Sequence, residues 1–235
     1  EEIESRINRI LLEFKQRDKL HRHGMLNRRK ILLEGSPGTG KTLTASIIAS
    51  ELKLPLYIVQ MDKLVTKYMG ETSIKLRQIF DTINDSLGVY LFDEFDAIGT
   101  DRSYDNDVGE MRRVLNSFLQ FIEQDLSDSI IIAATNNRKL LDQALFRRFD
   151  DVLHYDLPSE HEIVKLFNIK LGEFIEEITI DETLLQNAKK LSHAEITRAC
   201  NDAIKTVILK NQKLNNKLLN KMLTERYEVY HDKEA

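Results

Sequence analysis

The chain has 235 residues, of which 42% are hydrophobic and 31% are charged, and its formal net charge is −4. This composition is typical of a globular protein, and the slightly negative charge gives no reason to expect nucleic-acid binding. No apolar stretch approaches the ~20 residues that a membrane-spanning helix needs. The charged residues 1–10 do not resemble a signal peptide, and the start at Glu1 rather than Met indicates a fragment or a processed chain.

The predicted elements begin with a polar helical segment at residues 1–24. From 25 to 157, five short apolar runs alternate with helical patterns, at 31–33, 56–59, 89–92, 130–134 and 152–155. Apolar runs without polar alternation are typical of strands buried on both faces, hence of a parallel sheet. The helical patterns include Leu43, Ile47, Ile48 and Leu52, then Ile74, Ile79, Phe80 and Ile83; the stripe of the first segment is Ile3, Ile7, Ile10, Leu11 and Phe14. We therefore expect an α/β domain with a parallel sheet sandwiched by helices.

The strand patterns stop after Pro158, and residues 158–235 predict a small all-helical domain. Ile163, Phe167 and Leu171 have helical spacing, and Asp181 can cap a further helix. Ser192 and Glu195 form a predicted capping box. It opens a helix with one apolar face, comprising Ile196, Ala199, Cys200, Ala203, Ile204, Val207 and Ile208; a last helical stretch covers about 214–227. Cys200 is the single cysteine, which excludes an internal disulfide, favours a plain buried thiol and is usual for a cytoplasmic protein.

A phosphate-binding loop follows the first apolar run. Residues 35–42 match G-x-x-x-x-G-K-[ST] at every fixed position, between a predicted strand and a predicted helix. Such a loop turns backbone N–H groups towards phosphates, its lysine reaches the β- and γ-phosphates, and its hydroxyl binds Mg²⁺. The alternative is a glycine-rich turn that binds nothing. The predicted nucleotide-binding residues are Ser36, Pro37, Gly38, Thr39, Gly40, Lys41, Thr42, Leu43 and Asp93, with Thr42 and Asp93 as metal ligands.

Polar residues end two later strands. Asp93 and Glu94 follow residues 89–92, where Asp93 can hold the metal and Glu94 can orient or deprotonate water. Asn136 ends the next strand and can position water or touch the γ-phosphate. The alternatives are a solvated acidic strand end and an ordinary strand-end asparagine, and Asp96 is interpreted as a surface acid.

Taken together, these residues resemble the AAA+ ATPases, in particular their classical AAA branch, over about residues 25–205. Residues 91–99 resemble the extended Walker B motif, 134–136 sensor 1, and 141–150 the second region of homology. The adjacent arginines are similar to those of katanin, spastin and related remodelling ATPases. The resemblance implies bound ATP and Mg²⁺, and a role for Arg147 and Arg148 as arginine fingers in a neighbouring subunit's site. The alternative is two surface arginines that pair with Asp150 and Asp151.

Residues 67–72 resemble the family's first pore loop, which implies that Tyr68 and Met69 grip a polypeptide in a ring's channel; the alternative is packing at the start of the next helix. Residues 101–109 would be the second pore loop. Residues 192–196 resemble the lid motif that borders the nucleotide, although His193 replaces its glycine. Arg198 is interpreted as a solvent-facing helix residue.

The expected function is Mg-dependent ATP hydrolysis by a hexameric homo-oligomeric ring that remodels or threads protein. A separate protease or adaptor is a candidate partner. One alternative is an ATP-gated assembly module with little turnover, against which Glu94, Asn136 and the arginines argue. The other is a nucleic-acid motor, which the mixed charges of the two loops disfavour.

Overall fold

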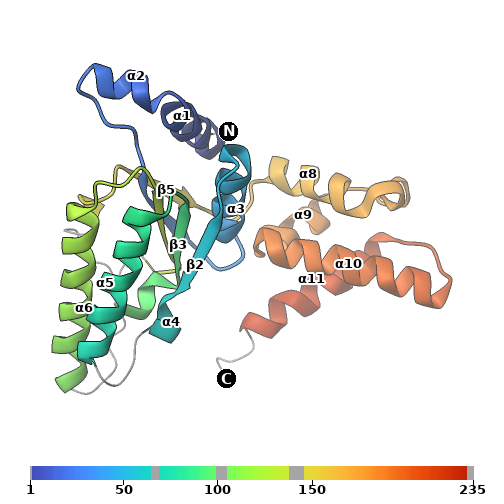
Figure 1. Ribbon diagram of the computed structural model, residues 1–235. Coiled ribbons are helices and arrows are strands. Elements are labelled where there is room, and N and C mark those ends of the chain that lie inside the picture. Colours follow the sequence, from blue (N-terminus) through green and yellow to red (C-terminus); the bar gives the residue numbers. More distant parts are fainter. Residues whose placement is uncertain (1, 65–68, 99–104, 138–145, 232–235) are drawn as a thin grey trace. The chain divides into compact units, whose positions relative to one another are not determined.

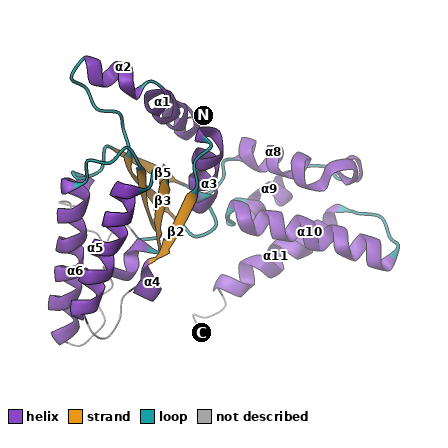
Figure 2. Ribbon diagram, in the orientation of Figure 1, coloured by secondary structure: helices purple, strands orange, loops and turns teal. Residues whose placement is uncertain are grey.

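The computed structural model describes residues 2–64, 69–98, 105–137 and 146–231, with side chains described for 2–64, 71–96, 113–137 and 146–229. The chain divides into two compact units: Glu1–Gly35 with Lys41–Tyr155, and Ser36–Gly40 with Asp156–Ala235. The first is an α/β unit and the second is helical (Figures 1 and 2).

The α/β unit is built on a five-stranded sheet in the order β2-β3-β4-β1-β5. Its strands are β1 (Lys30–Gly35), β2 (Leu56–Gln60), β3 (Val89–Asp93), β4 (Ile130–Thr135) and β5 (Asp151–Tyr155). All four pairings are parallel. The predicted parallel sheet is thus confirmed, because the buried aliphatic runs of β1, β3 and β4 occupy its centre.

Helices cover both faces of this sheet (Figure 1). One face packs against α1 (Glu2–Lys15) and α3 (Lys41–Leu52), and the other against α5 (Met69–Asp85) and α6 (Asp105–Gln124). The unit also contains α2 (Arg17–Arg22), α4 (Met61–Leu64) and the 3-10 turn η1 (Phe95–Ile98). Helix α1 packs into the core of the α/β unit, since its residues Ile10, Leu11 and Phe14 are buried beside residues of β1.

In α3 and α5, some residues of the predicted apolar stripe are exposed and do not lie on the buried face of the helix. In α3, Leu43 is 64% exposed and Ile47 is 44% exposed, whereas Thr44, Ala45, Ile48 and Ala49 are buried. In α5, Ile74 is 60% exposed. The helices were predicted correctly, but close packing of α3 on the sheet selects its small residues, which the spacing of large apolar residues does not reveal.

The helical unit contains α8 (Glu160–Leu171), η3 (Gly172–Glu177), α9 (Glu182–Ala188), α10 (His193–Lys210) and α11 (Asn216–His231). The predicted caps are confirmed: Asp181 accepts from Leu184 N, and Ser192 and Glu195 form a capping box. Ile196, Ala199, Cys200, Ala203 and Val207 are buried in one core, and burial raises the pKa of the Cys200 thiol to about 12. Ile208 was predicted to lie on that apolar face, but it is 65% exposed and does not.

In the described part of the chain, every helix is too short or too polar to cross a membrane. The boundaries at 24/25 and 157/158 remain predictions.

Candidate functional site

The candidate site lies at the carboxyl edge of the sheet, where parallel strands end together. β1, β4 and β3 are neighbours in the sheet, and they end at Gly35, Thr135 and Asp93. The phosphate-binding loop, the paired acids and Asn136 follow these three strand ends. The predicted residues therefore come from neighbouring strand ends of one sheet edge.

The loop requires glycine for steric reasons. At Gly35, φ is 150° and an added Cβ would lie 2.2 Å from the Tyr155 carbonyl oxygen. Gly38 and Gly40 have φ values of 76° and 114°, which L side chains rarely adopt. Glycine is therefore required at these positions of the loop by a close backbone contact or by a positive φ.

Lys41 and Thr39 are both buried, at 7% and 6% exposure. The Lys41 ammonium donates to the Gly35 carbonyl oxygen at 2.7 Å, and the Thr39 hydroxyl donates to the Ser36 oxygen at 2.8 Å. Burial lowers the pKa of Lys41, and the charges of Asp93 and Asp96 oppose that shift. A desolvated cation next to acids is suited to neutralising phosphate oxygens.

Thr42 and Asp93 can hold a divalent cation. The Thr42 hydroxyl donates to Asp93 Oδ2 at 3.1 Å, so two oxygen ligands of the type that Mg²⁺ prefers already lie together. The described residues contain no cluster of three or more His, Cys, Asp or Glu that could hold a metal.

Glu94 has an unusual backbone, with φ at 55°, and its N–H donates to Asp93 Oδ1 at 3.0 Å. A non-glycine residue with positive φ often marks a functional site. The pKa of Glu94 is raised, first by the charge of Asp62, then by burial and by Asp93 and Asp96. Asp62 lies in α4, directly after β2, and sequence reasoning missed it because no motif contains it.

Asp96 is not merely a surface acid, as the sequence suggested. Its Oδ1 accepts from Asn136 N at 3.2 Å and from the Thr135 hydroxyl at 3.4 Å. The turn after β3 is thereby tied to the end of β4. Asp96 holds the backbone of Asn136 relative to Glu94, a role that only the tertiary structure reveals.

Tyr155, which sequence analysis assigned no role, lies beside Gly35, the first residue of the phosphate loop. It is paired with Gly35 in the β1–β5 register, and its hydroxyl lies 2.6 Å from the Thr44 hydroxyl in the second turn of α3. Burial raises the Tyr155 pKa, and the Thr44 hydrogen bond opposes this. Tyr155 therefore supports both the strand and the helix that flank the loop.

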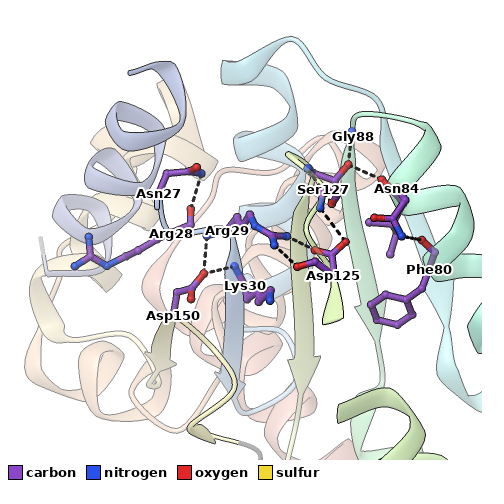
Figure 3. Close-up of polar contacts among 12 residues, drawn as sticks. Asn27, Arg28, Arg29, Lys30, Phe80, Asn84, Gly88, Asp125, Ser127 and Asp150 are labelled. Atoms are coloured by element: carbon purple, nitrogen blue, oxygen red, sulfur yellow. Dashed lines mark hydrogen bonds and ion pairs between the residues drawn. The ribbon is translucent and has the colours of Figure 1, made fainter. Parts of the chain in front are cut away.

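Arg147 and Arg148 are exposed residues between β4 and β5. Arg148 forms an ion pair with Glu123. The acids suggested as their surface partners are engaged elsewhere: Asp150 accepts backbone N–H groups and Asp151 pairs with Arg6 (Figure 3 for Asp150).

The predicted pore-loop residue Tyr68 lies outside the described residues. Met69 is the first residue of α5, and its side chain also lies outside the described part. Of the second predicted pore loop, residues 101–104 are outside it and residues 105–109 begin α6.

In the helical unit, to which residues 36–40 are grouped, Ala194 N donates to the Gly38 oxygen at 3.0 Å. His193 is half-buried, and burial lowers its pKa while Glu162 opposes the shift. Arg198 is exposed, in agreement with its interpretation as a solvent-facing residue.

Comparison with known proteins gives a consistent result. Residues 31–157 match the ATPase family associated with various cellular activities (AAA). An uncharacterised AAA family ATPase of Sinorhizobium fredii is 39% identical over 87% of this chain and 62% of its own length.

Two further relatives carry more specific names. A putative 26S proteasome regulatory subunit homologue of Methanothermobacter thermautotrophicus is 36% identical over 57% of this chain and 37% of its own length. The ATP-dependent zinc metalloprotease FtsH of Parabacteroides distasonis is 34% identical over 73% of this chain and 26% of its own length. The chain thus spans less than two thirds of each of these relatives.

Proposed function

The chain belongs to the AAA family of ATPases, and from this premise we propose that Mg-dependent ATP hydrolysis by a hexameric ring of identical subunits drives remodelling or threading of protein substrates. The chain is an ATPase. One observation carries the assignment of its site: Thr42 contacts Asp93 while Asp96 holds Asn136 at the same sheet edge.

ATP binds at the loop of residues 35–42 in this proposal. Backbone N–H groups and the Lys41 ammonium neutralise phosphate oxygens. Thr42 and Asp93 are the residues that would hold Mg²⁺, which would supply charge neutralisation at the phosphate oxygens when bound. Ser36, Pro37, Thr39 and Leu43 complete the set of loop residues proposed to contact the nucleotide.

Glu94 then acts on the attacking water. Its carboxylate accepts a proton from that water or orients it, and Asn136 fixes the water or a γ-phosphate oxygen. The positive φ of Glu94 and the hydrogen bond from its N–H to the Asp93 carboxylate support this role. Both residues need a fixed backbone, which their contacts with Asp93 and Asp96 provide.

A second subunit completes the site through the arginine pair. A guanidinium offsets negative charge on the transferred phosphoryl group, which is why an arginine from a neighbour can control turnover. Arg147 and Arg148 are exposed, which suits contact with another copy. This is the reason to propose a ring rather than an isolated ATPase.

Protein is the proposed substrate, and Tyr68 and Met69 are the proposed grip. The names of the relatives support this class of substrate, since one is a proteasome regulatory subunit homologue and one is an ATP-dependent metalloprotease. A separate protease or adaptor is the corresponding proposed partner, and the cytoplasm is the proposed location.

Tyr68→Ala should leave ATP turnover and melting temperature near wild type while it abolishes work on an unfolded model substrate. Equal loss of stability and turnover would assign Tyr68 to packing instead.

Turnover per subunit, measured against protein concentration, tests the ring proposal. It should rise over the range in which light scattering shows assembly, because a monomer lacks the trans arginine. Constant turnover across that range would contradict the ring. Assembly on ATP with negligible turnover would instead support the ATP-gated module.

A further inference from the structure

The adjacent arginines differ in how the chain holds them. Arg148 contacts the Glu123 carboxylate, and their side chains are 38% and 45% exposed. Among the residues that the structure describes, Arg147 makes no ion pair and is exposed. The two guanidinium groups are therefore not equivalent before any neighbour arrives.

The backbone that carries them is fixed on its C-terminal side. Phe149 is 7% exposed in the core under α6. Asp150 Oδ2 accepts from Arg29 N and Lys30 N, each at 2.9 Å, and Asp150 N donates to the Lys30 oxygen at 2.7 Å (Figure 3 for Asp150 with Arg29 and Lys30). These contacts fix the backbone that directly follows the two arginines.

Glu123 changes what Arg148 can offer electrostatically. It lies in the last turn of α6, where the helix dipole disfavours an acid and favours a nearby cation. Although an exposed ion pair contributes little to stability, the carboxylate largely cancels the guanidinium charge. An arginine paired in this way stabilises a neighbour's phosphoryl charge much less than an unpaired one.

We propose that Arg147 is the residue that completes the neighbouring subunit's ATP site. In this proposal Glu123 is a positioning residue, because its ion pair keeps Arg148 on its own subunit. This inference rests on the proposed ring function. It assigns Arg147 as the catalytic residue of the pair, and it gives Glu123 a role that no sequence motif indicates.

The test compares kcat and KM for ATP, at concentrations that give assembled protein, for Arg147→Ala, Arg148→Ala and Glu123→Gln. Arg147→Ala should lower kcat at least about 100-fold with KM near wild type, as expected for a transition-state contact. Arg148→Ala should lower kcat by no more than about threefold, since it removes only an exposed ion pair. Light scattering and melting temperature on each preparation exclude loss of assembly or folding as the cause.

The double variant Arg147→Ala with Glu123→Gln gives the sharpest result. Removal of the carboxylate releases Arg148, so kcat should recover about tenfold from the Arg147→Ala value as Arg148 takes over part of the role. A purely structural Glu123 would give no such gain. The matched control is Glu225→Gln, which removes a carboxylate from the exposed Lys221–Glu225 pair. It should change neither kcat nor KM for ATP.

Equal loss of kcat in Arg147→Ala and Arg148→Ala, or no recovery in the double variant, would overturn the inference. If the inference failed in either way but turnover per subunit still rose with protein concentration, the ring proposal would stand without the inference. If turnover were independent of concentration and neither arginine mattered, the ring proposal and the inference would both be wrong.

Discussion

Charged side chains gather at both ends of the parallel sheet, but the two ends use them differently. At the amino end, Arg29 and Asp125 form an ion pair with side chains 10% and 0% exposed, and Asp150 accepts the N–H groups that start β1 (Figure 3). Ser129 accepts from Gly88 N and donates to the Ile83 oxygen, each at 3.2 Å. In these contacts, opposite charges and donor–acceptor pairs are matched.

At the carboxyl end, acids crowd together. Asp62, Asp93 and Asp96 all raise the pKa of Glu94, whose backbone has a positive φ. Lys41 is desolvated, which lowers its pKa. The difference between the two ends shows that abundance of charge does not mark a site. Acids gathered around a residue with a positive φ and beside a desolvated lysine do, because a bound cation can relieve the repulsion among the acids.

The largest effect should follow from Glu94→Gln at the carboxyl end. The amide keeps the shape of the side chain but cannot accept the proton, so turnover should fall about 10²–10⁴-fold. ATP affinity and stability should remain near wild type, because Lys41 and Thr42 are untouched. Single-turnover hydrolysis and equilibrium ATP binding on one preparation measure both; unchanged hydrolysis would remove Glu94 from the catalytic role.

The next effect belongs to the amino end and should appear only in stability. Asp125→Ala leaves the largely buried Arg29 guanidinium without its carboxylate partner, which should cost about 3–5 kcal/mol of unfolding free energy. ATP affinity should change little in the folded fraction. The matched control is Asp128→Ala, which removes an exposed partner of Arg17 at 3.7 Å and should cost at most about 1 kcal/mol. Urea unfolding distinguishes them, and equal losses would show that the amino end is no better matched than the surface.

A smaller effect should come from Asp96→Ala, which removes the acceptor for Asn136 N. Turnover should fall about tenfold with ATP affinity retained, because the change acts on the position of Asn136 rather than on the phosphates. Asp96→Asn keeps an oxygen acceptor and should restore most of the rate. A loss of affinity in place of rate would mean that Asp96 acts on the nucleotide directly.

The smallest effect should come from Tyr155→Phe, which removes one buried hydrogen bond to Thr44. Loss of that bond should lower the free energy of unfolding by about 0.5–1.5 kcal/mol. Because Tyr155 supports the loop from β5, a modest rise in the Kd for ATP should accompany it. Thr82→Val, which removes an exposed hydroxyl bonded to Gln78, is a control expected to leave the Kd unchanged.

The sheet was predictable from the sequence because its central strands are unbroken apolar runs, such as residues 130–134. The phosphate loop was predictable because its backbone needs positive φ values and close contacts that glycine allows and most other residues do not. The caps at Asp181 and Ser192 were predictable because capping depends on residues close in the chain.

Contacts between distant residues were not predictable. Asp62 with Glu94, Asp96 with Asn136 and Glu123 with Arg148 each join segments that no local pattern connects. The exposed Leu43 and Ile47 show the same limit, because only the packed sheet decides which face of α3 is buried.

Equilibrium binding of a fluorescent ATP analogue to wild-type protein and to Lys41→Ala tests most directly whether the carboxyl end is the nucleotide site. Lys41 is the buried cation of the loop, so its loss should abolish tight, Mg-dependent binding. Lys53→Ala, which removes a lysine beyond the end of α3, should bind as the wild type does. Near-wild-type affinity in Lys41→Ala would contradict the assignment of this site.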